Sequence, residues 1–322
     1  SIRINGNDSN DSTASIDTTV QEKNITFPTD SKLHRKIIDK CRNIAEKENL
    51  PVRQSYTRTL KKLSLDQRFR NHPRNKWKAR KADRKEKTIA GRLVRELERN
   101  LSPDSRYQSD IDLFKRILNQ KKSDKNKTYS VHEPDVQCIS KGKEHKKYEF
   151  GNKVSIIYTQ TTGVIIGALG FRNPYDGHTI EPALEQTERL LGKRTLKTLI
   201  GDRGYKGKRQ INDTTIEIPK PFNNRKQSQY QQNKLKKQFR KRAAIEPING
   251  HLKTDHRLNR NFYKGITGDN INVMLAAAAF NFKRMMNKWK SSFWLEFKIQ
   301  IVDLIKAMFY QINNNIIRKW AF

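Results

Sequence analysis

Two acidic residues that lie far apart in the sequence could hold a divalent cation together. Asp17 interrupts a short β-prone run at residues 15–20, and Asp202 follows a strand-like apolar run at the start of a glycine-containing turn. Two carboxylates on neighbouring strands repel each other unless a cation lies between them. Mg²⁺ prefers oxygen ligands and is bound by one or two carboxylates together with substrate phosphates. The chemistry that these residues predict is phosphoryl transfer assisted by two metal ions.

Glu246 is a third candidate, within a helical pattern. Phe239 and Arg242 precede it by seven and four residues, and Lys253 follows it by seven. This spacing predicts that an aromatic ring, a guanidinium, a carboxylate and an ammonium share one stripe of an ideal helix. Pro247 disfavours helical geometry at Glu246, so we expect a kink there. In the simpler interpretation, Arg242 and Glu246 form an exposed salt bridge of little energetic value.

The two strand-associated acids also have simpler interpretations. Asp202 could close an Asx-turn through Gly204, and Asp17 could be a turn acid in a polar leader. Asp135 and Asp176 compete with Asp17 for the first position, because either could approach the sheet. Three histidines near these motifs are expected to contact hydrogen-bond partners, phosphate or solvent rather than metal, which would be oxygen-coordinated: His178, His251 and His256.

Hydrophobic periodicity predicts the elements that position the acids. The first strand is followed by three amphipathic helices between Asp30 and Gln120. Strand patterns at 153–158 and 163–169 then flank a hairpin turn. A helix capped by Thr179 and ended by Gly192 leads to the strand that precedes Asp202. Three further segments are predicted: an edge strand at 215–218, a core helix at 270–286 and an amphipathic packing helix that carries Trp294, Phe297, Ile301, Leu304 and Met308.

The charge of the chain favours nucleic acid as its partner. Its 322 residues include 67 Lys and Arg against 33 Asp and Glu, a net charge of +34. Ten of the twenty residues at 68–87 are basic, and residues 222–242 hold eight basic residues and no acid. Both stretches predict surfaces for phosphates, although each could also be a solvated charge run. The hydrophobic fraction of 34% indicates a packed core surrounded by exposed basic helices and tails.

Other classes of protein are disfavoured by composition. Two cysteines, Cys41 and Cys138, are too few for a zinc cluster or a disulfide framework, and they fit a reducing cytoplasm. The longest charge-free apolar run, at 271–282, is shorter than the roughly 20 residues that span a bilayer. The chain begins with Ser1 and no signal-peptide pattern follows, so these are expected to be internal residues of a longer product.

Three acid-centred motifs follow one another along the chain: IDTTVQEKNITFPTD around Asp17, GDRGYKG around Asp202 and RAAIEPINGHLK around Glu246. They resemble the three acids of the bacterial insertion-sequence transposases of the DDE type, in the branch named after insertion sequence five. The segment that starts at Phe239 is similar to that superfamily's Tyr-x2-Arg-x3-Glu-x6-Lys signature, with phenylalanine in place of tyrosine. Further similar stretches are SKGKEHKKYEFGNKVS, NPYDGHT and LNRNFYKGITGDNINVMLAAAAFNF, so that the resemblance covers about residues 15–290.

The resemblance implies an α/β fold with a ribonuclease-H-like mixed sheet flanked by helices. In such enzymes the first two acids come from adjacent strands and the third from a helix beside the sheet. They cut transposon ends and join them to target DNA with Mg²⁺, for which we expect Mn²⁺ to substitute. Carried over to this chain, Asp17, Asp202 and Glu246 would be the catalytic residues and the ligands of two ions, and Arg242 and Lys253 would contact end DNA. A homodimer in the bacterial cytoplasm, associated with the nucleoid, is also implied.

Asp17 is favoured over its competitors because it alone combines a β-prone setting with the matching motif. The other expected DNA contacts follow from charge and from aromatic side chains that permit base stacking: Arg203, Lys206, Lys237, Phe239 and Arg240. The expected organisation is a polar leader at 1–14, the first strand of the catalytic domain at 15–29, a basic helical insertion at 30–128, the rest of the catalytic domain at 129–290 and an amphipathic helical tail at 291–322.

Two other functions are consistent with these residues. One is a catalytically silent, basic DNA-binding remnant of a transposase. The other is a metal-dependent nuclease that only hydrolyses DNA. All three functions share the phosphate-binding surface, and they differ in whether DNA is joined, cut or only bound.

Overall fold

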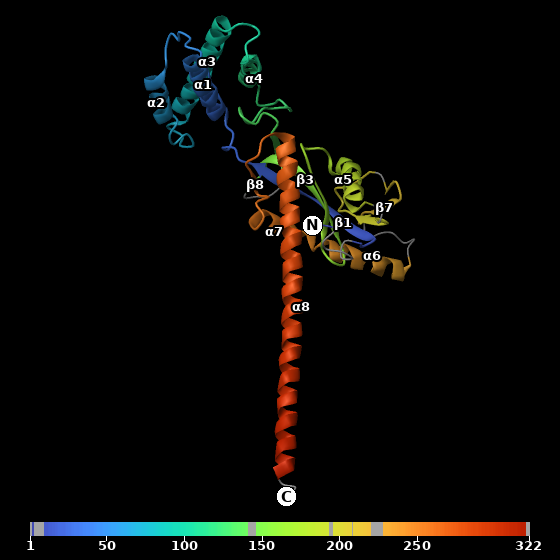
Figure 1. Ribbon diagram of the computed structural model, residues 1–322. Coiled ribbons are helices and arrows are strands. Elements are labelled where there is room, and N and C mark those ends of the chain that lie inside the picture. The colour runs from blue at the N-terminus through green and yellow to red at the C-terminus, as the bar shows by residue number, and fades with distance from the viewer. Residues whose placement is uncertain are drawn as a thin grey trace.

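The computed structural model describes residues 2, 10–140, 146–192, 196–207, 209–219 and 228–319 (Figure 1). The strands are β1 (Thr13–Lys23), β2 (Gln137–Ser140), β3 (Tyr148–Thr159), β4 (Ile165–Phe171), β5 (Thr198–Ile200), β6 (Gln210–Ile211), β7 (Thr214–Glu217) and β8 (Arg260–Asn261). The helices are α1 (Asp30–Lys47), α2 (Thr57–Asp66), α3 (Lys76–Asn100), α4 (Gln108–Asn119), α5 (Asp176–Leu191), α6 (Gln229–Arg242), α7 (Ile245–Thr254) and α8 (Gly265–Lys319).

The strands form one mixed sheet with β1 near its centre. The order is β2-β3-β1-β5-β7-β6, with β4 also paired to β3 and β8 to the end of β1. β1 runs antiparallel to β3 and parallel to β5, and β5 runs parallel to β7. The strand predicted at 215–218 corresponds to β7, but it is not an edge strand, because β6 pairs with its outer side.

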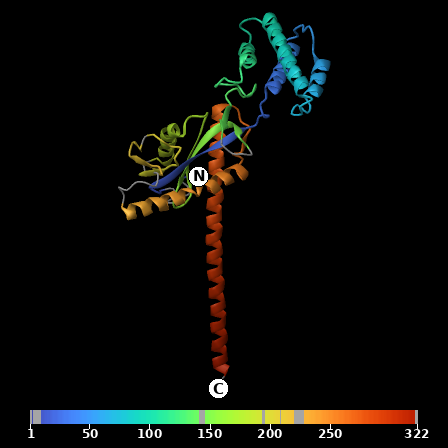
Figure 2. The ribbon, with the colours of Figure 1, turned by 180° about the vertical axis from the view of Figure 1, so that it is seen from behind.

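Helices cover both faces of this sheet, as the opposite views of Figures 1 and 2 show. On one face α5 packs over a core that includes Ile16, Leu184 and Leu199. On the other face α7 and the first part of α8 pack over Ile156 and neighbouring apolar residues. Because side chains alternate along a strand, β1 directs even-numbered residues such as Ile16 toward α5 and odd-numbered residues toward α7.

A helical segment separates β1 from β2 in the sequence. It contains α1 to α4, where periodicity predicted three helices rather than four. The helix that the prediction missed is α2, whose apolar positions are few and are interrupted by basic residues. The four helices share a hydrophobic core of their own, which includes Ile37, Leu93 and Phe114, and they lie together beyond one end of the sheet (Figure 1).

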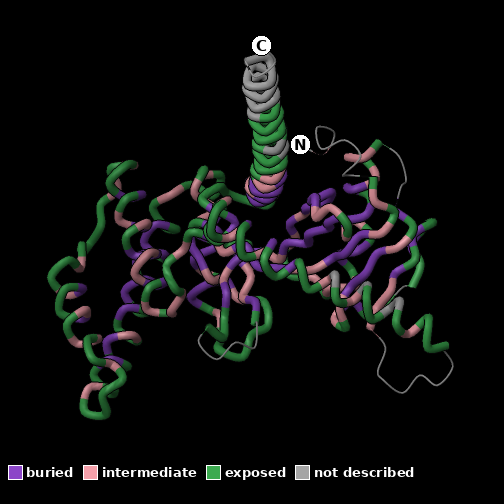
Figure 3. Tube along the Cα trace, turned by 90° about the horizontal axis from the view of Figure 1, so that it is seen from below, coloured by how far each residue is buried: buried purple, intermediate pink, exposed green. Residues whose placement is uncertain are grey.

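The C-terminal part of the chain is one continuous helix. α8 spans 55 residues, about 80 Å at 1.5 Å per residue, and only its first part packs on the sheet domain (Figure 3). The helix predicted at 270–286 is present as part of α8, and its Val273, Ala276 and Ala277 pack into the core, whereas its Ile271, Leu275 and Met286 are exposed. In the predicted packing helix, Trp294, Phe297 and Ile301 are exposed and do not pack on the sheet domain, and the side chains of Leu304 and Met308 lie outside the described part of the chain. No helix in the described ranges is long and apolar enough to cross a bilayer.

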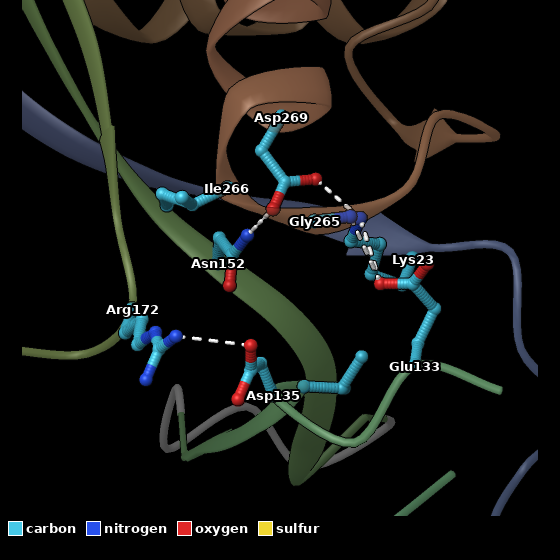
Figure 4. Close-up of a pocket in the computed structure, with 9 residues that line it drawn as sticks. Lys23, Glu133, Asp135, Asn152, Arg172, Gly265, Ile266 and Asp269 are labelled. Carbon is cyan, nitrogen blue, oxygen red and sulfur yellow. Dashed lines mark hydrogen bonds and ion pairs between the residues drawn. The ribbon is translucent and has the colours of Figure 1, made fainter. Parts of the chain in front are cut away.

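A buried ion cluster fastens the end of β1 to the start of α8 (Figure 4). The Nζ atom of Lys23 lies 2.6 Å from Asp269 Oδ1 and 3.2 Å from Glu133 Oε2, and all three side chains are less than one-tenth exposed. Lys23 also donates to the carbonyl of Tyr263 at 2.8 Å, and Asn152 of β3 donates to Asp269. The cluster thus ties together strands β1 and β3, the chain before β2, and α8.

Candidate active site

The register of the two central parallel strands decides how Asp17 lies relative to Asp202. Ser15 of β1 pairs with Ile200 of β5, and each acid follows its paired residue by two positions. Ile200 faces away from the α5 side, because its neighbour Leu199 packs into the core on that side. Asp17 therefore faces the α7 side of the sheet, and Asp202 follows the end of β5, the strand beside β1.

The Asp202 side chain closes the turn that follows β5. Its Oδ1 atom accepts a hydrogen bond of 2.7 Å from the amide of Gly204, as the Asx-turn interpretation predicted. This bond fixes the carboxylate at the end of the strand and leaves its second oxygen for another ligand. No ammonium or guanidinium of the described residues forms an ion pair with Asp202.

Glu246 comes from the first turn of α7, and Asn249 follows it on the same helix face. Asn249 Nδ2 donates to Asp17 Oδ2 at 3.2 Å, which joins this face of α7 to β1. The predicted stripe is wrong in one respect, because the helix is interrupted. α6 ends at Arg242 and α7 begins at Ile245. Phe239 and Arg242 therefore belong to α6, whereas Glu246 and Lys253 belong to α7.

Pro247 explains part of this geometry. It lies in the first turn of α7, where a missing amide hydrogen costs no helical hydrogen bond, so the kink expected at Glu246 is replaced by a new helix start. The expected salt bridge between Arg242 and Glu246 is not formed among the described residues. Instead the carbonyl of Arg242 accepts a hydrogen bond of 2.9 Å from the Tyr158 hydroxyl, which anchors the end of α6 to β3.

Asp176 reaches the same region from the α5 side. It is the first residue of α5, three residues before Thr179, which was predicted to cap the helix but lies buried inside it. Asp176 Oδ1 accepts a hydrogen bond of 3.0 Å from the Thr18 hydroxyl and lies 3.0 Å from the Nζ atom of Lys153. By contrast, Asp135 is exposed and pairs with Arg172 at 2.9 Å. Asp135 and Asp176 were the alternatives to Asp17, and of these two Asp176 is the one that contacts β1 next to Asp17.

The residues expected to contact DNA differ in exposure. Arg203 and Lys206 are exposed on the turn after β5, and Lys237 and Arg240 are exposed on α6. The remaining three, Phe239, Arg242 and Lys253, are partly buried on α6 and α7.

The histidines lie outside the acid pair, as expected. His251 contacts Asp255 at 3.0 Å, and the ring of His178 packs against Tyr175. Burial lowers the pKa of His256, with the charge of Lys283 acting in the same direction. Among the described residues no group of three His, Cys, Asp or Glu side chains could hold a metal ion as it stands.

Asp17 in β1 and Asp202 after β5 nevertheless have side chains that suit a hard divalent cation. Asp17 supplies carboxylate oxygens from β1, and Asp202 supplies them from the turn after the adjacent strand β5. Mg²⁺ needs only one or two protein carboxylates when phosphate and water complete its coordination. The buried hydroxyl of Tyr205 is influenced by the charges of both acids, and no described acceptor meets full hydrogen-bond geometry with it. The residues present therefore fit such a group.

Sequence reasoning missed Asn249 and Lys153. Asn249 stands three residues after Glu246 in the motif already singled out, a spacing that places both on one helix face. Lys153 had no local signal, because its importance depends on the pairing of β3 with β1 and on the position of α5.

The comparisons with known proteins bear on the segment that carries two of the three acids. Residues 127–282 match the family model of the transposase DDE domain. The match to the transposase DDE domain runs from before β2 into α8, so it contains Asp202 and Glu246 and begins after Asp17. The match covers a little under half of the chain.

One curated relative matches a short part of the chain. A segment of 59 residues is 42% identical to an uncharacterized protein, ORF8 in the nfe locus of Rhizobium meliloti. The segment is 18% of this chain and 28% of that protein, so the chain spans less than a third of this relative. No solved structure matches the chain.

Proposed function

We propose that the chain is a DDE transposase, of the branch named after insertion sequence five, that cuts transposon ends and joins them to target DNA. The observation that carries this proposal is the register of β1 and β5. It supports a common site for Asp17 and Asp202, although 185 residues separate them in the sequence. Bonding of Asn249 to Asp17 supports Glu246, one turn earlier on α7, as the third acid.

A ribonuclease-H-like assignment is consistent with two of these observations. The first acid lies in β1, the second follows the adjacent strand β5, and the helix that bears the third lies beside the sheet. We assign β1 together with residues 129–290 to the catalytic domain. The helices α1 to α4 are assigned as a basic insertion that clamps DNA, because residues 68–87 are half basic.

In the proposed mechanism the chain holds its carboxylates ionised and oriented. A divalent cation, when bound, activates the attacking oxygen and stabilises the leaving oxygen. Asp17 and Asp202 would hold it, with Asn249 and the Gly204 amide fixing the two carboxylates by hydrogen bonds. The attacking group is water in the first step and a DNA 3′-hydroxyl in the second. Glu246 would complete the site from α7.

The exposed basic residues would bind the DNA backbone on either side of the cut. Arg203 and Lys206 follow Asp202 directly and would contact phosphates near the scissile bond. Lys237 and Arg240 would extend this contact along α6, with Phe239 available for base stacking. Arg242 and Lys253 are assigned to end DNA by their positions in the motif around Glu246.

An assay with labelled ends tests the proposed function. The chain is incubated with duplexes that carry the ends of its own element, a supercoiled target and Mg²⁺ or Mn²⁺. We expect joined products, because the proposed site uses the 3′-hydroxyl of a cut end as its second nucleophile. Cutting without joining would indicate a hydrolytic nuclease, and binding without cutting would indicate a silent DNA-binding protein. Either result contradicts the proposal, provided that the ends are bound.

A homodimer is proposed from the exposed part of α8. A single helix in water is marginal without tertiary packing, yet α8 continues far beyond the sheet domain and exposes Phe293, Trp294 and Phe297. A second copy would cover these rings. We expect light scattering to give the mass of a dimer for the natural chain and of a monomer for the double substitution of serine for Phe293 and Phe297. Lys298→Ser, on the same segment, is expected to leave the dimer intact, and a monomeric natural chain would contradict the proposal.

A further inference from the structure

The carboxylate of Asp176 approaches that of Asp202 across a glycine. A Cβ atom added to Gly204 would lie 2.9 Å from Asp202 Oδ1 and 3.2 Å from Asp176 Oδ2. The two oxygens are therefore at most about 6 Å apart, a separation that suits one direct and one water-mediated contact to the same ion. Any side chain at Gly204 would fill this space.

A buried hydroxyl lies among the same acids. The Tyr205 side chain is only 1% exposed, and its hydroxyl has no hydrogen-bond partner among the described residues, although Thr18 is nearby. The pKa of Tyr205 is raised well above its ordinary value by burial and by the negative charges of Asp17, Asp176 and Asp202. A phenol that stays protonated can donate to a carboxylate or to a water held by an ion. Thr18 interacts with this hydroxyl, and no described acceptor meets full hydrogen-bond geometry with it.

The two carboxylates beside Gly204 differ in their ion pairs. Asp176 pairs with Lys153, whereas no cation of the described chain pairs with Asp202. Carboxylates this close together favour a cation between them. An ion pair of Asp176 and Lys153 alone would explain neither the space beside Gly204 nor the buried Tyr205 hydroxyl.

We propose that Asp176 is a fourth acidic residue of the metal centre, which with Asp202 holds the second divalent cation, and that Lys153 is its counter-charge when that cation is absent. The proposal rests on the function proposed above. In it, Asp176 Oδ2 faces the ion or its water, while Oδ1 stays fixed by Thr18 and Lys153. Tyr205 is a positioning residue whose hydroxyl donates to a carboxylate or to a water of this second cation.

Metal binding without DNA tests this role independently of activity. The full chain is titrated with Mn²⁺ by calorimetry, and bound Mn²⁺ is counted by electron paramagnetic resonance. We expect two ions for the natural chain. For Asp176→Asn we expect one ion, or a second ion bound at least about tenfold more weakly, because a charged ligand is lost. For Lys153→Met we expect the opposite change, tighter binding of the second ion, because a competing cation is removed.

Asp135→Asn is the matched control, since it removes an exposed, paired carboxylate that lies away from Asp176 and Asp202 and is expected to change nothing. Thermal unfolding in the presence of a chelator shows whether each variant is folded, and if Asp176→Asn is not, Lys153→Met alone tests the proposal. Two ions bound with unchanged affinity by Asp176→Asn would overturn it, as would unchanged binding by Lys153→Met. If Asp202→Asn abolishes Mn²⁺ binding while Asp176→Asn does not, the role proposed for Asp176 is wrong but the proposed transposase function still stands. If the natural chain binds no Mn²⁺, both proposals fail.

Discussion

Replacing Asp202 by asparagine is expected to lower the rate of metal-dependent DNA cleavage by about a thousandfold or more, and replacing Asp17 by asparagine is expected to do the same. Both changes keep the size of the side chain and remove the negative charge that would hold the cation. DNA affinity is expected to change by less than about twofold, because it comes from the basic surface. Cleavage is measured on labelled duplex ends in Mg²⁺, and affinity on the same duplexes by fluorescence anisotropy.

The Asp17 variant is the more decisive of the two, because Asp17 lies outside the segment that matches the transposase DDE domain. Asp112→Asn provides the control, since this acid is exposed on α4, far along the chain from either strand. Cleavage by Asp17→Asn at the natural rate would remove Asp17 from the site and return Asp176 as the candidate first acid. Cleavage by Asp202→Asn at the natural rate would contradict the enzyme assignment itself.

Replacing Lys23 by methionine is expected to lower the free energy of unfolding by about 3–5 kcal/mol. Methionine fills much of the same volume, but it leaves the buried carboxylates of Glu133 and Asp269 without their ammonium (Figure 4). It also leaves the carbonyl of Tyr263 without its donor. The free energy is measured by urea unfolding of the full chain, followed by circular dichroism.

Lys146→Met is the matched control, because Lys146 forms an exposed ion pair with Glu22, one residue before Lys23. Its expected effect is below about 1 kcal/mol. The loss caused by Lys23→Met should shrink as the pH falls from about 7 to about 5. Burial raises the pKa of Asp269 even with Lys23 beside it, so without the ammonium this acid takes up a proton more readily in the folded chain than in the unfolded one. A loss that is small at neutral pH, or that grows on acidification, would contradict this account.

Local sequence patterns were sufficient for most of the elements that carry the acids. The β-prone run around Asp17 is β1, the two strand patterns after residue 150 are β3 and β4, and Gly192 ends α5 with a positive φ of 70°. Each of these depends on neighbouring residues, either through the alternation of a strand or through the left-handed backbone that glycine adopts at little cost. The positions where prediction failed are those where distant residues decide the outcome.

Prediction failed at three positions: at α2, at the helix boundary at Asp176 and at the interruption between α6 and α7. A short basic helix such as α2 forms because it packs on α3, and the periodicity of its own residues is too weak to reveal it. Thr179 has the side chain of a helix cap, yet burial against the sheet places it inside α5. Local propensity is overridden in each case by tertiary packing.

The sequence by itself determined the chemistry that is available, namely a carboxylate within one strand pattern, another directly after a second, and a large excess of positive charge. It also determined which elements carry Asp17, Asp202 and Glu246, because short-range periodicity fixes the type of each element. Only the tertiary structure decided how the segments that carry these acids lie relative to one another, since the register of β1 with β5 and the docking of α5 and α7 depend on contacts between residues far apart in the chain. Asp176 shows the difference, because its sequence motif was visible, whereas its proximity to Asp202 follows from the packing of α5 against the strand ends.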